Sequence, residues 1–575
     1  MLFDPARAAG LEPDQPYGNR SALMGILARQ QVRLETHMTQ LRKWLILTHR
    51  YVGIALSVIF VSWFASGIAM LYGRGMPRLT SDMRLERLAP IDTSAVHLSA
   101  TEALERAELD GTDRVTLLTV MGRPAYRLGG GNESTTVFAD NGELLADIDA
   151  AQAQSVAAAF VRLPENRLRY VARLTEPDQW SLTLRQGPMH KFTVDDEAGT
   201  EVYVSERNAD VTVLTTRGSR ALAWVGAIPH FLYFAPLRLN QPLWRAVVLW
   251  TSGIGILLAL LGIVLGILQL KIARPFSVKR LPSYLPYSGW MRWHYVSGLV
   301  FGVFTLTFVF SGWLSMEPWG WATSAGRFGG GLREAFTSNA GDVNAFRVLN
   351  AEAWQTIAGG RPIKEVEYVR IQDEPFFLVR RDPDSTAGTE IRGHEPYFAV
   401  RSRDAAQKVV NARTLQLHDQ DFPAASLLDR VRHAVPDTAI SNAEMLTTYD
   451  SYYYSRDGLA PLPVLRVKLE DPDRTWLYID PRMSQLVGRI HRLDRAERWL
   501  YNGLHSLDFS FWYYRRPLWD VVMILLSLGG LTTSAIGLCL GLKRVARGLR
   551  GIVTPGTQPD PVFWSNEIHR TVERR

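Results

Sequence analysis

The stretch WVGAIPHFLYF at residues 224–234 returns as WLYNGLHSLDF at residues 499–509. Each copy begins with a tryptophan, ends with a phenylalanine and places a histidine between them, His230 in the first and His505 in the second. These histidines are 275 residues apart, and each copy leads toward a long apolar run. The same spacing, without a gap, relates Tyr203 to Tyr478, Arg217 to Arg492, Arg220 to Arg495, the Pro-Leu-Trp motifs 242–244 and 517–519, and Gly255, Gly262 and Gly266 to Gly530, Gly537 and Gly541.

A second spacing, of 245 residues, pairs His49 with His294. It also relates Gly53 to Gly298 and the Ser-Gly pair 66–67 to the pair 311–312. Recurrence of many residues at a fixed spacing indicates a repeated architecture. We therefore interpret the chain as a tandem duplication in which four of its 12 histidines were copied together.

Four uncharged runs are long enough to cross a membrane. They cover residues 51–72, 246–270, 295–316 and 521–542. At about 1.5 Å of rise per helical residue, each run spans a hydrocarbon core of about 30 Å. The first run starts past residue 40 and lacks the small-residue ending of a signal peptide, so we expect an uncleaved first span. The sequence thus predicts an integral membrane protein with an all-α bundle of four transmembrane helices.

Basic residues beside the spans predict the orientation. The linker 271–293 carries five basic residues and no acidic one, and further basic residues precede the first span and follow the fourth. Because cytoplasmic flanks are enriched in Lys and Arg, we expect both termini and this linker in the cytoplasm of a bacterial-type inner membrane, and the two long segments in the periplasm. These flanks account for much of the net charge of +7, so the charge gives no reason to expect nucleic-acid binding.

The expected organisation follows from these spans. It comprises a cytoplasmic N-terminal tail (1–40), a first span (41–73), a periplasmic segment (74–223), a histidine-bearing segment with the second span (224–271), a cytoplasmic linker (272–290), a third span (291–317), a second periplasmic segment (318–498), a histidine-bearing segment with the fourth span (499–543) and a cytoplasmic tail (544–575). Hairpin patterns such as residues 134–146, with an Asn-Gly turn, predict an α+β fold for both periplasmic segments.

The chain resembles the PepSY-associated transmembrane family. The resemblance covers about residues 40–545, in two copies, and rests on a first span with His-x-x-x-Gly and Ser-Gly, strand-Asp-Pro-turn hairpins, and Trp, His and Pro-Leu-Trp before a glycine-rich span. It implies two PepSY-like periplasmic segments. The family includes inner-membrane ferric-siderophore reductases with two b-type haems, so the resemblance implies two haem b groups here. Two large periplasmic segments set this chain apart from shorter members and suggest a larger periplasmic partner.

The residues themselves also predict how haem would be held. Each half has two spans, so both halves enter the membrane in the same direction and equivalent residues share a depth. His49 and His294 should then meet near the cytoplasmic face, and His230 and His505 near the periplasmic face, each pair binding one iron from opposite sides. The single cysteine, Cys539, and the absence of a Cys-x-x-Cys-His motif mean that such haem is not covalently attached.

Gly53 and Gly298 lie one turn beyond His49 and His294, where a missing side chain would let a flat macrocycle approach the backbone. A single histidine at a membrane interface more often serves as a hydrogen-bonding residue than as a ligand. The other eight histidines are weaker candidates: His37, His97, His190, His394, His418, His433, His491 and His569.

Two other patterns have simpler interpretations. The run Trp512-Tyr-Tyr-Arg-Arg516 offers an aromatic and cationic surface for an anionic iron chelate, but an interfacial aromatic belt is the more common role of such residues. Asp471 and Asp473 are typical of a turn and show no metal-ligand spacing.

Together these features predict a transmembrane electron carrier. Electrons from quinol or a cytoplasmic donor would enter near His49 and His294, cross to His230 and His505, and reduce a periplasmic acceptor, for which a ferric siderophore or other ferric chelate is the expected class. The expected partners are therefore this chelate, the electron donor and membrane lipid. Two alternatives remain: a non-enzymatic envelope protein whose PepSY-like segments bind a peptide or protease, and a transporter component.

Overall fold

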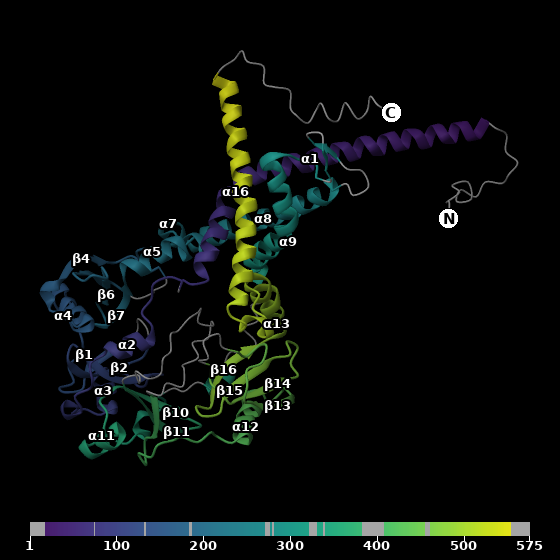
Figure 1. Ribbon diagram of the computed structural model, residues 1–575. Coiled ribbons are helices and arrows are strands. Elements are labelled where there is room, and N and C mark those ends of the chain that lie inside the picture. The colour runs from purple at the N-terminus through teal and green to yellow at the C-terminus, as the bar shows by residue number, and fades with distance from the viewer. Residues whose placement is uncertain are drawn as a thin grey trace. The chain divides into compact units, whose positions relative to one another are not determined.

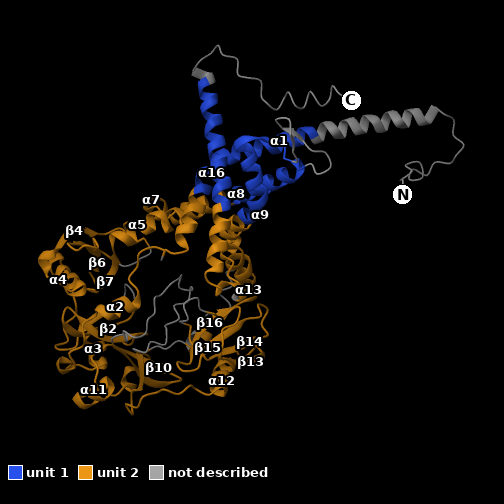
Figure 2. Cartoon of the chain, in the orientation of Figure 1, with its two compact units in different colours: residues 1–61, 253–306, 529–575 blue, residues 62–252, 307–528 orange. Residues whose placement is uncertain are grey.

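The computed structural model describes residues 18–73, 75–130, 134–182, 187–270, 276–278, 281–283, 285–320, 331–336, 340–381, 407–454 and 460–553. Within these residues the chain forms two compact units, coloured separately in Figure 2. The first unit comprises residues 1–61, 253–306 and 529–575, and the second comprises residues 62–252 and 307–528. One of the two predicted histidine pairs falls in each unit.

Among the residues that the structure describes, four helices are long and apolar enough to cross a membrane, which confirms the four predicted spans. They are α1 (Gly18–Met70), α8 (Gln241–Gln269), α9 (Gly289–Leu314) and α16 (Leu518–Val553), labelled in Figure 1. A helix satisfies its backbone hydrogen bonds internally, as a segment in lipid must. Large apolar side chains such as Trp250, Val303 and Leu525 point outward, 73%, 54% and 56% exposed, as expected for side chains that face lipid.

Two of these helices extend into the predicted cytoplasmic tails. Helix α1 begins at Gly18 within the predicted tail 1–40, and α16 continues to Val553 within the predicted tail 544–575. The α1 extension contains Leu, Ala, Arg and Gln, which favour helix, whereas the α16 extension contributes chiefly three arginines. Hydropathy sets where a span crosses the membrane, whereas helix propensity and capping set where the helix ends.

The residues between the spans form a sheet that both long segments share. Its six strands lie in the order β12-β11-β10-β1-β2-β3. Strands β1 (Val115–Val120), β2 (Arg123–Leu128) and β3 (Thr135–Phe138) come from the first segment, and β10 (Ile363–Ile371), β11 (Glu374–Arg381) and β12 (Gln407–Asn411) come from the second. Antiparallel pairing of β1 with β10 joins the two segments, which the sequence suggested as separate α+β parts.

Two smaller sheets have the same order and register. One is β4 (Leu168–Leu174), β5 (Met189–Val194), β6 (Glu201–Ser205) and β7 (Val211–Thr215); the other is β13 (Ile440–Leu446), β14 (Val464–Leu469), β15 (Trp476–Asp480) and β16 (Gln485–Ile490). Lys191 pairs with Tyr203 in the first sheet, and Arg466 pairs with Tyr478 in the second. Each partner differs from its counterpart by 275 residues, so the sequence spacing reappears as equivalent strand pairing.

A helix covers one face of each smaller sheet. Helix α4 (Ala150–Val161) buries Ala153 and Ala157 against the first, and α12 (Ala424–Ala434) buries Leu427 and Val431 against the second. Short helices then follow each sheet and carry His230 and His505. These are α5 (Arg217–Val225) and α6 (Ala227–Phe231) after the first, and α13 (Arg492–Glu497), η7 (Arg498–Gly503) and α14 (Leu504–Ser506) after the second.

The remaining described elements are short. They are α2 (Ser81–Arg87), η2 (Thr93–Ala95), α3 (Ala100–Arg106), η4 (Glu165–Arg167), α7 (Ala235–Arg238), β8 (Phe276–Val278), β9 (Leu281–Ser283), η5 (Pro318–Gly320), α10 (Gly331–Phe336), η6 (Val343–Ala345), α11 (Ala351–Ala358) and α15 (Ser510–Tyr513).

A buried ionic cluster reinforces the shared sheet. Glu365 on β10 pairs with Arg380 on β11 and, across the two segments, with Arg84 on α2 at 2.7 Å. Burial alone would raise the pKa of Glu365, but the neighbouring Arg380 and Arg84 outweigh it and lower the pKa to about 2. Lys364 adds a second link by donating to the backbone oxygens of Leu85 and Glu86 at 3.0 and 2.7 Å.

Replacing Glu365 with alanine should lower the free energy of unfolding by about 1–3 kcal/mol, because Arg84 would lose this carboxylate partner and Arg380 would keep only Glu367. Urea denaturation of the detergent-purified chain would measure this. Glu374→Ala is the matched control, since Glu374 on the same sheet pairs with Arg413 at 3.5 Å while half-exposed, and should change stability by under about 0.5 kcal/mol. Equal effects of the two substitutions would contradict the assigned role of the cluster.

Candidate functional site

The four histidines that the two sequence spacings relate lie as two pairs. The rings of His49 on α1 and His294 on α9 have centroids 6.4 Å apart, and those of His230 on α6 and His505 on α14 have centroids 6.0 Å apart. Two imidazoles that bind one iron from opposite sides, each through a nitrogen about 2.0 Å away, have centroids about 6.3 Å apart. The centroid spacing of both pairs is therefore compatible with one shared metal ion, and all four rings are only partly buried.

Backbone carbonyls set the tautomer of the His49–His294 pair. The Nδ1 of His49 lies 3.2 Å from the oxygen of Leu258 on α8, and the Nδ1 of His294 lies 3.1 Å from the oxygen of Thr533 on α16. A carbonyl oxygen only accepts hydrogen bonds, so each Nδ1 must donate its hydrogen, which leaves the lone pair on Nε2. This is the arrangement of a metal-ligating histidine, whose other nitrogen is held by a carbonyl or carboxylate.

Two serines hold the His230–His505 pair. The Oγ of Ser66 lies 3.3 Å from the Nδ1 of His230, and the Oγ of Ser311 lies 3.0 Å from the Nδ1 of His505. The Nδ1 of His505 also lies 3.2 Å from the oxygen of Phe308, which assigns the hydrogen to that nitrogen. Both serines are buried and belong to the Ser-Gly motifs 245 residues apart, so the repeated motif positions the repeated histidine.

A glycine lies against each histidine ring. A Cβ at Gly262 would come within 2.9 Å of the Cε1 of His49, and one at Gly537 within 3.2 Å of the Cε1 of His294. Gly67 and Gly312 lie against the other two rings at 3.6 and 3.7 Å, where a Cβ would make an ordinary contact. A side chain at Gly262 would therefore force the His49 ring to shift, one at Gly537 would crowd the His294 ring, and the other two glycines only permit close approach.

Gly53 and Gly298, which the sequence singled out, do not face the histidines. A Cβ at these positions would meet Leu258 and Thr533 instead, at 3.7 and 3.8 Å. The contacting glycines, Gly262 and Gly537, lie on α8 and α16, the helices that also supply the carbonyl oxygens. Only their 275-residue spacing marked them in the sequence, and that spacing does not say which histidine they touch.

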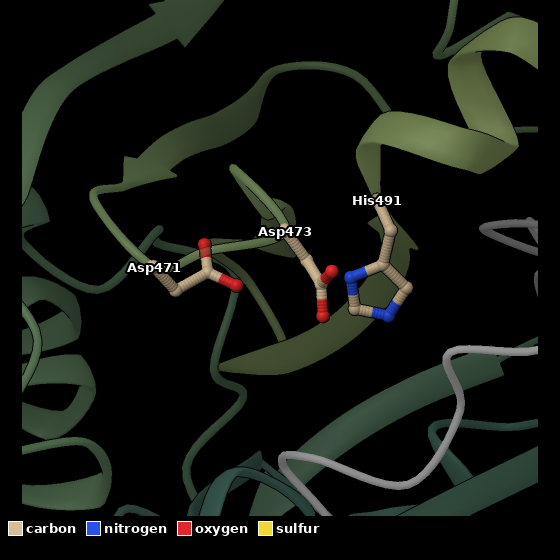
Figure 3. A group of neighbouring side chains, drawn as sticks. All are labelled: Asp471, Asp473 and His491. Carbon is tan, nitrogen blue, oxygen red and sulfur yellow. The ribbon is translucent and has the colours of Figure 1, made fainter.

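His491 belongs to a third group, with Asp471 and Asp473, whose possible ligand atoms all lie within 4.8 Å of one another (Figure 3). The carboxylate of Asp471 accepts from both the backbone nitrogen and the hydroxyl of Thr475, at 2.6 and 2.7 Å, and that hydroxyl lies 2.9 Å from the Nδ1 of His491. Asp196 and Thr200 make the same two bonds in the other small sheet. The group is therefore the hydrogen-bonded turn that the sequence predicted at Asp471 and Asp473, joined by His491 at the start of α13.

Arg516, in the aromatic run 512–516, interacts mainly with neighbouring residues of the protein. Its guanidinium lies 4.2 Å from the ring centroid of Trp519 and forms an ion pair with Asp520 one turn along α16. Because Asp520 neutralises its charge, Arg516 is better suited to packing than to binding an anionic ligand.

Glu497, near the end of α13, is the acidic group with the largest upward shift outside the spans among the described residues. Burial, and then the nearby carboxylates of Glu317 and Asp494, raise the pKa of Glu497 to about 7. It lies on the helical run that continues into α14 and His505.

The chain matches the family described as the PepSY-associated TM region over residues 46–355. The match includes three of the four spans and His49, His230 and His294, and covers more than half of the chain. No curated protein matches the chain.

The pKa of Glu497 gives a pH-dependent stability. A carboxyl group with a folded pKa near 7 and an unfolded pKa near 4.5 stabilises the fold fully below about pH 4.5, and this contribution is lost as the pH rises through 7. We expect Glu497→Gln to raise the melting temperature much more at pH 8 than at pH 5. The control is Glu352→Gln on the surface of α11. A melting temperature of Glu497→Gln that tracks the wild type at both pH values would show that the carboxylate carries no penalty.

Proposed function

Since the chain belongs to the PepSY-associated transmembrane family, we propose that it is a membrane electron carrier that binds two non-covalent haem b groups and reduces a ferric chelate. The proposed axial ligands are His49 with His294 and His230 with His505. The observation that carries this proposal is the spacing of both ring pairs, 6.4 and 6.0 Å, which fits two imidazoles on one iron.

The chain's own residues supply three things at each pair. The histidines provide two nitrogen ligands, the partners of Nδ1 fix the ring orientation and increase the basicity of Nε2, and the glycines leave room beside the rings. When bound, haem supplies one-electron redox chemistry, which none of these side chains provides.

We further propose that the chain arose by tandem duplication and lies in a bacterial-type inner membrane. The matching order and register of the two small sheets support the duplication. The basic flanks of the spans support cytoplasmic termini and periplasmic sheets. In this orientation the donor is quinol or a cytoplasmic reductant, and the acceptor is reached from the periplasm.

A ferric chelate suits such an acceptor. One electron leaves the donor and converts Fe(III) to Fe(II), so the donor is oxidised by one electron and the chelating groups are unchanged. Fe(II) is a softer ion that hard oxygen ligands bind more weakly, so reduction releases the metal. The uncharged interiors of the spans disfavour the alternative of ion transport.

Haem content tests the proposal directly. We expect about two haems per chain in the detergent-purified protein, about one in His49→Ala and in His505→Ala, and close to none in the double variant, because each substitution removes one axial ligand. Pyridine haemochrome absorbance measures the number. His433→Ala on the exposed surface of α12 is the control and should keep both haems. A colourless wild type from haem-replete cells would falsify the proposal and favour the peptide-binding alternative.

The glycine contacts provide a test that leaves all four histidines in place. Gly262→Val adds a side chain where even a Cβ would lie 2.9 Å from His49, so it should displace that ring and reduce bound haem to about one per chain. Gly548→Val, at a site on α16 with no atom within 4 Å of the added Cβ, should retain both. Equal haem content in the two variants, measured by the same absorbance assay, would argue against ligation at His49.

A further inference from the structure

Three cations surround one tryptophan on the outer face of the second small sheet. The Nζ of Lys468 lies 4.4 Å from the ring centroid of Trp476, and the guanidinium carbons of Arg495 and Arg466 lie 4.6 and 5.4 Å from it. We call these four residues the Trp476 cluster. All four side chains are partly accessible, whereas the opposite face of the same strands packs against α12.

The other small sheet has a carboxylate at the corresponding place. Glu201 is 275 residues before Trp476, and its carboxylate lies 3.0 Å from Lys191 and 3.6 Å from Arg220. Those two cations correspond, at the same spacing, to Arg466 and Arg495. The first sheet thus carries its own anion between two cations, whereas the second replaces that anion with an aromatic ring.

The second sheet also has an additional cation. Lys468 stands where the first sheet has Thr193, and it pairs with Trp476 across β14 and β15. Against the loss of the Glu201 carboxylate, the second sheet gains the carboxylate of Glu444, which lies opposite Arg466 where the first sheet has Ala172. With the ammonium of Lys468 added, the cluster carries one positive charge more than its counterpart.

Only one cation of the cluster has a carboxylate partner in the part of the chain that the structure describes. Arg466 pairs with Asp450 at 2.7 Å and with Glu444 at 2.5 Å. Arg495 instead donates to the backbone oxygens of Arg474 and Ile490. Burial lowers the pKa of Arg495, and more distant groups such as Tyr452 and Asp494 only partly oppose this shift, as expected for a cation without a close anion.

A short series of rings connects the cluster to the helical run that bears His505. Tyr452 lies edge-on to Trp476 with ring centroids 5.3 Å apart, and its hydroxyl accepts a hydrogen bond from the Nε1 of Trp499 at 3.1 Å. Trp499 is on η7, which continues directly into α14 and His505. A ligand on the cluster would therefore be bound beside the segment that positions the proposed outer haem ligand.

We propose that the Trp476 cluster is the docking site for the ferric chelate, and that this chelate is a multiply negative, catecholate-type complex. The identity of the ligand as the electron acceptor rests on the proposed function. Lys468 and Arg495 supply the charge complementarity that an anionic complex requires, and electron-rich catecholate rings also interact with such cations. A neutral hydroxamate-type complex would gain little from these residues.

The first small sheet supplies the substitutions for the test. Trp476→Glu restores the carboxylate found at Glu201, and Lys468→Thr restores the residue found at Thr193; both residues are already tolerated at the equivalent strand positions. Arg432→Ala is the control, because Arg432 is an exposed cation on α12 of the same half, paired with Asp429. The probe is a gallium(III) tris-catecholate complex, which has the charge of the ferric complex and is redox-inert under these conditions.

Isothermal titration calorimetry on the full-length purified protein should show binding of this probe by the wild type and by Arg432→Ala. We expect Kd to rise by about tenfold or more in Trp476→Glu and by several-fold in Lys468→Thr. A neutral gallium tris-hydroxamate complex should bind more weakly to the wild type and be insensitive to both substitutions. Absence of tris-catecholate binding, or an equal Kd in all four proteins, would overturn the docking proposal.

Haem content, measured on the same preparations, separates this proposal from the proposed function. Normal haem content with cluster-independent binding would contradict the docking site alone. Cluster-dependent binding to a protein without haem would support the docking site and contradict the electron-carrier proposal. Retention of haem in Trp476→Glu also verifies that this variant is folded.

Discussion

The hydrogen bonds from histidine Nδ1 to backbone carbonyls are the constraint on which the candidate site depends. A helix offers no free carbonyl along its length, yet Leu258 and Thr533 each receive the Nδ1–H of a histidine on another span while remaining in α8 and α16. This added bond fixes ring rotation and tautomer together, because a carbonyl can only accept. Without it, two imidazoles 6.4 Å apart would be neighbours with no defined direction for their lone pairs.

These bonds also explain why glycine must accompany histidine. For the ring of His49 to reach the Leu258 carbonyl, it must lie against the surface of α8 one turn further along, where Gly262 stands. The same relation holds for His294, Thr533 and Gly537 on α16. The carbonyl and the glycine one turn further along the helix therefore position the histidine ring together. A substitution at either glycine acts on the histidine and not merely on helix packing.

The spans could be predicted because each depends on a local run of apolar residues. The two histidine pairings could be predicted because each depends on residues that recur at a fixed spacing. Apolar runs are read directly from residues 51–72 and their equivalents, and the 245 and 275 spacings mark which histidines correspond. The shared sheet escaped prediction because pairing of β1 with β10 joins residues such as Val115 and Tyr368, which lie far apart in the chain and in different segments. The contact of Gly262 with the His49 ring was not predicted for a related reason. Helical periodicity places neighbours on one helix, whereas the contact with the ring comes from another helix.

Comparison of the two small sheets separates residues that maintain the fold from residues that set its chemistry. Tyr203 and Tyr478 both direct their hydroxyls to a carboxylate, Asp178 or Asp450, and each is fully buried. Burial and these carboxylates raise the pKa of both tyrosines, so the hydroxyls stay protonated and act as donors. This buried tyrosine–carboxylate hydrogen bond is present in both sheets and stabilises the same face of each.

The two sheets differ in the side chains around this tyrosine–carboxylate hydrogen bond, which are not needed to fill the core. Where one sheet has Glu201 balancing Lys191, the other has Trp476 beside Lys468 and Arg495, so the same backbone presents a neutralised surface in one case and a positive one in the other. An aromatic ring can keep cations close without cancelling their charge, which a carboxylate cannot do. The replacement therefore preserves the packing of the face while leaving its positive charge available to an external anion.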